Sequence, residues 1–252
     1  MRLTILGRSA ACPNPGGACS GYLLEDGDAS ILLDCGTGIV SRLRQVCDYR
    51  KLSAIIISHL HVDHFIDIIP YIYGLKLISG IVDGRRLPLF LPPGGSSTLN
   101  TILSMWKDLP TLASEVFEIQ EFNPSEALKV GHLSLSFAQT VHYIPCWATR
   151  VDAGKTLIYS ADSGPSEALV DLAQGGDLLL AEAALLEKKG VPAEAGHLTP
   201  REAGEIAKRA GVARLVLTHF WQEFDAQRMV REAGEAFGGP IELAEEWKAY
   251  TL

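Results

Sequence analysis

The chain has 252 residues, of which 47% are hydrophobic and 21% charged, with a formal net charge of −8 at pH 7. This composition is typical of a globular α/β enzyme with a sizeable core and excludes a disordered or fibrous protein. The negative charge argues against a broad basic surface that would bind an extended nucleic acid through its phosphates. We expect no membrane span and no signal peptide, and therefore a cytoplasmic protein.

The first part of the chain alternates apolar runs with turn residues. Three such runs are predicted to be strands: residues 2–6, 20–25 and 30–34. A helix is expected after Gly38, capped by Thr37, with Ile39, Leu43 and Val46 on its buried face. This order predicts a strand-rich start that leads into the first helix.

The second half of the chain repeats the alternation. Strands are predicted at residues 133–140, 148–152, 156–160, 177–182 and 214–218. Helices are predicted at residues 166–173, 200–210 and 226–237. No Pro/Ser-rich linker or short repeat divides the sequence, so we expect a single domain over residues 1–252, with two sheets covered by helices.

The most informative segment follows the β-branched run at residues 54–58, which is itself a predicted strand. It reads SHLHVDH from Ser58 to His64, with three imidazoles and a carboxylate in six positions. A strand that ends in such a loop can direct His59 and His61 to one ion while Asp63 and His64 turn to a second. The alternative is an exposed His-rich turn, which the position of the aspartate disfavours. The segment therefore predicts a metal site for two ions.

Three further candidate ligands stand just past predicted strands, where the loops of layered α/β folds gather functional residues. They are His142, Asp162 and His219. Each one alone would be interpreted as a capping or hydrogen-bonding residue. Their joint placement favours metal binding.

Taken together, these motifs resemble the metallo-β-lactamase superfamily, over nearly the whole chain. The resemblance implies a four-layer αββα sandwich. It implies one ion held by His59, His61 and His142, a second held by Asp63, His64 and His219, and Asp162 as a bridge. The turn after residue 33 also matches the family, and we interpret its Asp34 as structural.

The segment His197-Leu198-Thr199 looks like the phosphodiesterase branch of that superfamily, which contains tRNase Z. The resemblance implies that His197 is a proton donor supported by Glu182, so the predicted catalytic residues are Asp63, Glu182 and His197. In that chemistry a hydroxide between two metals attacks phosphorus, and the departing alkoxide takes a proton from an imidazole. The alternative for His197 is a residue that merely flanks the helix start at Thr199 and Pro200.

The length of one segment limits the range of substrates that we expect. tRNase Z usually carries a long tRNA-binding arm between the positions of His142 and Asp162, but only nineteen residues separate them here. Residues 147–159 resemble a bare hairpin that turns at residues 152–155. We therefore expect a small anionic phosphodiester, such as a cyclic nucleotide. A tRNA 3′-processing endonuclease and a carbonyl hydrolase acting on a thioester or lactam stay open as alternatives.

The remaining expectations concern cofactor and partners. Imidazole and carboxylate ligands without a thiolate suit zinc, the default, and also Mn, Fe or Co. The five cysteines form an odd set without a CxxC pair and are expected to be reduced thiols. A homodimer is compatible with the resemblance. A non-enzymatic binding protein on this fold is disfavoured by the intact ligand set.

Overall fold

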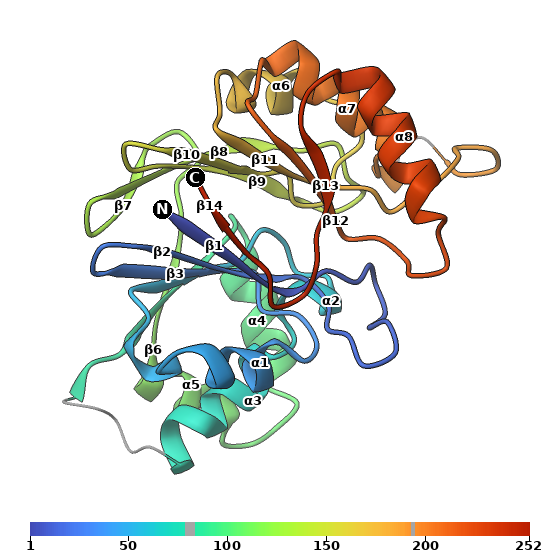
Figure 1. The fold of residues 1–252 in the computed structure, drawn as a ribbon. Helices are drawn as coiled ribbons and strands as arrows, with labels where there is room; N and C mark the ends of the chain where they lie inside the picture. The colour runs from blue at the N-terminus through green and yellow to red at the C-terminus, as the bar shows by residue number, and fades with distance from the viewer. Residues whose placement is uncertain (79–83, 193–194) are drawn as a thin grey trace.

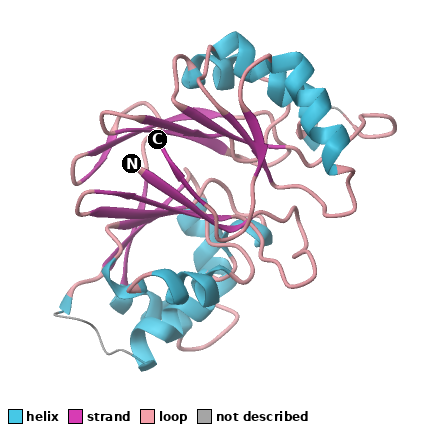
Figure 2. Ribbon diagram, viewed as in Figure 1, coloured by secondary structure: helices cyan, strands magenta, loops and turns pink. Residues whose placement is uncertain are grey.

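The computed structural model describes residues 1–78, 84–192 and 195–252. Two seven-stranded sheets face each other, and helices cover both outer faces (Figures 1 and 2). The layers run helix, sheet, sheet, helix, which confirms the predicted αββα sandwich. Within the described residues, no helix is long and apolar enough to cross a membrane.

The first sheet has the strand order β14-β1-β2-β3-β4-β5-β6. Its strands are β1 (Arg2–Gly7), β2 (Gly21–Asp26), β3 (Ala29–Leu33), β4 (Ala54–Ile56), β5 (Leu87–Leu91), β6 (Phe117–Glu121) and β14 (Ala249–Thr251). The strands from β3 to β6 are parallel, whereas β14, β1, β2 and β3 pair antiparallel. The helical segments on this side are α1 (Ile39–Val46), η1 (Tyr49–Lys51), α2 (Val62–Phe65), α3 (Ile68–Tyr73), η2 (Gly74–Ile78), α4 (Gly95–Leu103) and α5 (Leu109–Val116).

The second sheet has the order β13-β12-β11-β10-β9-β8-β7. Its strands are β7 (Leu128–Val130), β8 (Leu133–Gln139), β9 (Trp147–Asp152), β10 (Thr156–Tyr159), β11 (Leu178–Glu182), β12 (Leu215–Thr218) and β13 (Ile241–Leu243). The strands from β10 to β13 are parallel, and those from β7 to β10 are antiparallel. Its outer face carries α6 (Glu167–Ala173), α7 (Pro200–Ala210) and α8 (Ala226–Phe237) (Figure 1).

The central strands are apolar on both faces because each face is covered. In β11, Leu178 and Leu180 pack in the core between the two sheets, whereas Leu179 and Ala181 pack beneath the helices. Side chains alternate between the faces of a strand, so a strand buried on both sides needs an unbroken apolar run. The apolar run from Leu178 to Ala181 therefore explains why β11 lies inside the second sheet and not at its edge.

Several predicted elements are confirmed and some details are wrong. The helices at residues 166–173, 200–210 and 226–237 and the hairpin at residues 147–159 are present. The strand predicted at residues 54–58 ends at Ile56. Thr37 does not cap α1; Gly38 precedes the helix in a left-handed conformation, with a φ of 90°, and makes no side-chain cap. Val46 is 42% exposed because α1 ends there and Cys47 is extended.

Ser20, just before β2, and the loop after β3 pack directly on the backbone of α2. Ser20 N donates to Asp63 O at 3.1 Å, Cys35 N donates to His64 O at 2.7 Å, and Gly36 N donates to Ser20 O at 2.9 Å. A Cβ atom on Gly36 would collide with the carbonyl oxygen of Asp63. The absence of a side chain at Gly36 thus lets two backbone segments meet where Asp63 and His64 are placed.

We expect Gly36→Ala to lower the free energy of unfolding by about 2 kcal/mol or more, since the added methyl forces two backbones apart. Denaturant unfolding followed by circular dichroism measures this change. The control is Gly234→Ala in α8, where the nearest atom lies 3.6 Å from the added Cβ. That variant should be neutral or stabilised by up to about 1 kcal/mol. Equal stability of Gly36→Ala and wild type would contradict the close approach.

Candidate metal centre

The seven predicted ligands come together at one edge of the sandwich. His59 and His61 follow β4, and Asp63 and His64 lie on the single turn of α2. The other three follow strands of the second sheet: His142 after β8, Asp162 after β10 and His219 after β12. Residues from both sheets therefore build one cluster, as their position at strand ends predicted.

The first group of ligand atoms consists of three imidazole nitrogens and one carboxylate oxygen. His61 Nδ1 lies 3.0 Å from His59 Nε2 and 3.1 Å from His142 Nε2. Asp162 Oδ2 lies 3.6 Å from His59 Nε2 and 3.9 Å from His142 Nε2. All four atoms lie within 4.8 Å of one another, a spacing at which a single ion can contact them all.

The second group lies on the other side of Asp162. His64 Nε2 is 3.4 Å from Asp63 Oδ2, and His219 Nε2 is 3.8 Å from the same oxygen. Asp162 Oδ1 is 3.3 Å from His64 Nε2 and 3.4 Å from His219 Nε2. The two oxygens of Asp162 thus face one group each.

Two atoms of this cluster indicate that a cation belongs in it. His64 Nε2 and Asp162 Oδ1 are buried and lie 3.3 Å apart, but neither makes a hydrogen bond of ordinary geometry. An unpaired buried polar atom is costly, and a coordinated ion would satisfy both atoms at once. Imidazole nitrogens and carboxylate oxygens suit divalent first-row metals. The residues present therefore fit a divalent metal.

The ring nitrogens that point away from the centre are held by hydrogen bonds. The pairs are His64 Nδ1 with Asp34 Oδ2 at 2.8 Å, His219 Nδ1 with Ser20 Oγ at 3.0 Å, His59 Nδ1 with Ser58 Oγ at 3.0 Å, and His142 Nδ1 with Gly196 O at 3.2 Å. Such partners fix the orientation of a ligand ring before an ion arrives.

Asp34 does more than shape its turn. The fully buried carboxylate accepts hydrogen bonds from Ser58 N at 2.7 Å, Ser58 Oγ at 2.8 Å and the Tyr159 hydroxyl at 2.7 Å, in addition to its contact with His64. The structural interpretation of Asp34 stands, and the structure adds that it orients His64. The sequence signal for a structural role was the turn after residue 33, which contains Asp34.

Backbone strain is concentrated at the cluster. His219 has a φ of 51°, Ala161, just before Asp162, has a φ of 50°, and Asp34 has a φ of 59°. Non-glycine residues adopt this left-handed region at a cost that the surrounding structure must offset. The strands are therefore followed by tight turns that direct His219 and Asp162 into the centre.

The charge states of the ligands differ within the cluster. Burial lowers the pKa of His59 well below its usual value and that of His61 to about 4, so both rings are neutral at pH 7. Burial opposes the charge on Asp162, yet the imidazoles of His219 and His64 hold its pKa well below the usual range. Burial opposes the charge on His64, but the carboxylates of Asp162 and Asp63 raise its pKa well above the usual value. A metal would have to displace that proton, because neutral imidazoles and ionised carboxylates are the forms that bind metal.

His197 stands beside the cluster in a different state. Its Nδ1 donates to Glu182 Oε1 at 2.8 Å, and its ring centroid lies 5.0 Å from that of His142. Glu182 is fully buried and also accepts from the backbone amides of Ser163 and Ala184, at 3.0 Å and 2.9 Å. Burial opposes protonation of His197, but Glu182 prevails and raises its pKa to about 9. His197 is thus an imidazolium at neutral pH.

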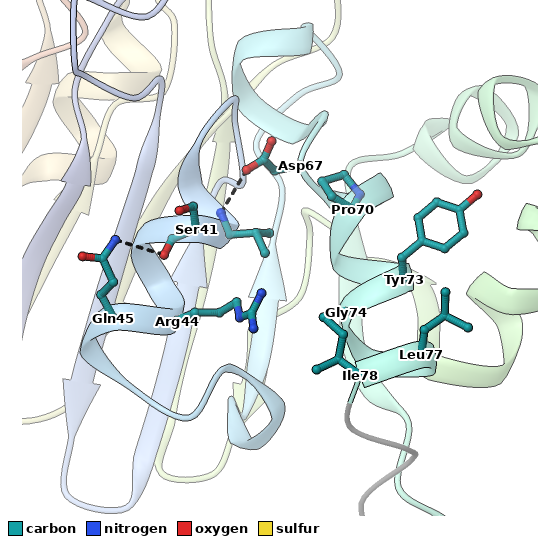
Figure 3. Close-up of a pocket in the computed structure, with 10 residues that line it drawn as sticks. Ser41, Arg44, Gln45, Asp67, Pro70, Tyr73, Gly74, Leu77 and Ile78 are labelled. Atoms are coloured by element: carbon teal, nitrogen blue, oxygen red, sulfur yellow. Dashed lines mark hydrogen bonds between the residues drawn. The ribbon is translucent and has the colours of Figure 1, made fainter.

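A cavity of about 760 Å³ lies away from the cluster, between α1 and the segment formed by α3 and η2 (Figure 3). Of its lining residues, Asp67 accepts a hydrogen bond from the backbone of Val40 at 2.9 Å, and Tyr73 and Leu77 are exposed. None of the described residues that line it belongs to the cluster, which places the metal chemistry at the cluster and not in this cavity.

Comparisons of sequence and of structure both find similarity to β-lactamase superfamily proteins. Residues 29–220 match the β-lactamase superfamily domain. The chain is 30% identical over 247 residues to the probable metallo-hydrolase YhfI of Bacillus subtilis, covering 97% of each. The crystal structure of that protein superposes with a TM-score of 0.88 over 99% of this chain and 98% of the other, at 29% identity.

Ribonuclease Z proteins are also similar. That of Methanopyrus kandleri is 26% identical over 273 residues, covering 93% of this chain and 92% of the relative. Human tRNase Z, short form, shares the fold, with a TM-score of 0.77 at 23% identity over 100% of this chain and 99% of the other.

The Glu182 carboxylate should control the charge of His197. We expect Glu182→Gln to lower the pKa of the His197 imidazole from about 9 toward its ordinary value of about 6.5, because the main interaction that opposes burial is removed and only the weaker effect of Asp162 remains. Titration of the metal-free protein by NMR measures this pKa, with His197→Ala to assign the signal. An unchanged pKa would contradict the role of Glu182.

The same contact makes stability depend on pH. Because folding raises the pKa of His197, its contribution is complete below about pH 6.5 and is lost as the pH rises through about 9. The contribution is on the order of 3 kcal/mol. Unfolding free energy of the metal-free wild type should therefore fall more steeply over this range than that of Glu182→Gln, whereas parallel curves would contradict the assignment.

Proposed function

The chain belongs to the β-lactamase superfamily as a metallo-hydrolase related to ribonuclease Z, and we propose that it is a phosphodiesterase cleaving small phosphodiesters such as cyclic nucleotides. The observation that carries this proposal is the imidazolium of His197, held by buried Glu182 beside the His/Asp cluster. Cleavage of a phosphodiester releases an alkoxide, which needs a proton. A carbonyl hydrolase gives this pair no necessary role.

We assign the ligands to two divalent ions. One ion would be held by His59, His61, His142 and Asp162, and the other by Asp63, His64 and His219, with Asp162 within reach of both. Zinc is the default, and the same donors admit Mn, Fe or Co. When bound, such ions activate water and neutralise negative charge on phosphoryl oxygens.

His197 and Glu182 would supply the proton for the leaving group. The Nδ1 proton of His197 is engaged by Glu182, which leaves the Nε2 proton for the departing oxygen. Glu182 is fixed by two backbone amides, so the imidazolium is held in one orientation. A donor that is charged before the substrate arrives needs no rearrangement during the reaction.

The segment between His142 and Asp162, all of which the structure describes, supports a small substrate. Strands β9 and β10 are joined by a tight turn in which Ala153 N donates to Lys155 O at 2.9 Å. The turn leaves no inserted arm for a tRNA, and the net charge of −8 opposes a long phosphate backbone. The ribonuclease Z relatives keep tRNA 3′-processing as the second candidate.

The proton-donor role predicts a dependence on the leaving group. The alkoxide released from cyclic AMP needs a proton, whereas p-nitrophenolate leaves without one. We expect His197→Ala to lower kcat for cyclic AMP by about 10²- to 10⁴-fold, but kcat for bis-p-nitrophenyl phosphate by less than about tenfold. Initial rates with metal-reconstituted protein measure both effects, and metal analysis checks that the ions are retained.

The control is His132→Ala, which removes an exposed histidine that contacts Asp26 outside the cluster. This variant should match wild type on both substrates. Equal losses on the two substrates in His197→Ala would refute proton donation. Wild-type turnover of only a thioester or a cephalosporin would refute the phosphodiesterase, and cleavage of pre-tRNA without cyclic AMP would favour the second candidate.

A further inference from the structure

A cavity of about 400 Å³ opens beside the cluster. Its wall includes Leu60 and His61 after β4, Pro92 and Pro93 after β5, and Pro145 after β8. His61 is also in the first group of ligand atoms, so the cavity borders the proposed metal centre directly. A group attached to a molecule held at that centre can therefore enter it.

The cavity is apolar in character. No residue with a charged acidic or basic side chain is among the described residues that line it. The start of α4 forms part of the wall, but the amides of Gly94 and Ser96 already donate to the two oxygens of Glu121, each at 2.9 Å. This helix start offers no free site for an anion. A phosphoryl group would find its partners at the ions and not in the cavity.

An aromatic side chain lies at the mouth of the centre. The Tyr143 ring centroid is 4.7 Å from those of His61 and His142, and the residue is 63% exposed. Its next neighbours in the chain, Ile144 and Pro145, line the cavity. Exposure of a large ring beside a metal cluster leaves its surface available to stack on a planar ligand.

We propose that this cavity, with Tyr143 beside it, is the subsite for the nucleobase of a nucleotide phosphodiester. The inference rests on the proposed function, which puts the phosphoryl group at the ions. A nucleobase is planar and has apolar faces, which suit proline and leucine walls and an aromatic stacking surface. The volume lies within the range of about 300–1,000 Å³ that is usual for small-molecule sites.

The test compares two ligands that differ in the base. AMP and ribose 5-phosphate carry the same phosphate group, and their binding to metal-reconstituted protein is measured by calorimetry. Wild type should bind AMP about tenfold or more tightly, the order expected for stacking one base. Thr98 lines the cavity from an exposed position on α4, so Thr98→Trp should fill it and abolish the preference.

Two controls make the comparison specific. Thr101→Trp adds the same bulk at an exposed position farther along α4, outside the described cavity lining, and should keep the preference for AMP. Tyr143→Phe should also keep it, whereas Tyr143→Ala should reduce it about tenfold. Similar affinities of wild type for the two ligands, undetectable binding of AMP, or an unchanged preference in Thr98→Trp would overturn the subsite.

Failure of the subsite and failure of the proposed function give different results. A protein that binds AMP selectively, loses this selectivity in Thr98→Trp and hydrolyses no phosphodiester would support the subsite and refute the phosphodiesterase. A protein that hydrolyses cyclic AMP but binds AMP and ribose 5-phosphate equally would support the phosphodiesterase and overturn the subsite.

Discussion

The buried carboxylate of Asp162 is the interaction on which the rest of the centre depends. It lies between two groups of imidazoles, with one oxygen toward each, and its Oδ1 makes no hydrogen bond of ordinary geometry. An ionised carboxylate is costly to bury without compensating charge, and cations between the groups would supply it. The strained turn at Ala161 holds the carboxylate between the two sheets' ligands. The fold thus places ligands from both sheets around the carboxylate of Asp162.

The sequence could predict the elements whose ends carry a local signal. Helices α6, α7 and α8 are preceded by Ser166, Thr199 and Asp225, each of which caps its helix through the side chain. Strands β5 and β6 were not predicted. β5 contains Pro88, which a sequence pattern counts against a strand, and β6 is largely polar because its residues are only partly covered. Apart from Pro88, β5 has the apolar run typical of a buried parallel strand, whereas β6 does not.

The candidate ligands could be predicted because chemistry and position coincide at the ends of strands. Their supports could not, since these contacts join distant parts of the chain. Asp34 meets His64 across thirty positions, and Gly196 meets His142 across fifty-four. The cavity beside His61 could not be predicted from the sequence either. Part of its wall, Pro92 and Pro93, follows β5, a strand that the sequence does not predict. Such contacts arise from the folding of both sheets together.

A metal cluster built around Asp162 thus lies beside a charged proton donor, His197, which Glu182 holds in place. The measurement that tests this arrangement most directly is a crystal structure of the zinc-reconstituted protein with anomalous scattering recorded at the zinc edge. We expect two peaks on either side of Asp162, one among His59, His61 and His142, and the other among Asp63, His64 and His219. A single peak, or ions that do not both contact Asp162, would contradict the central claim.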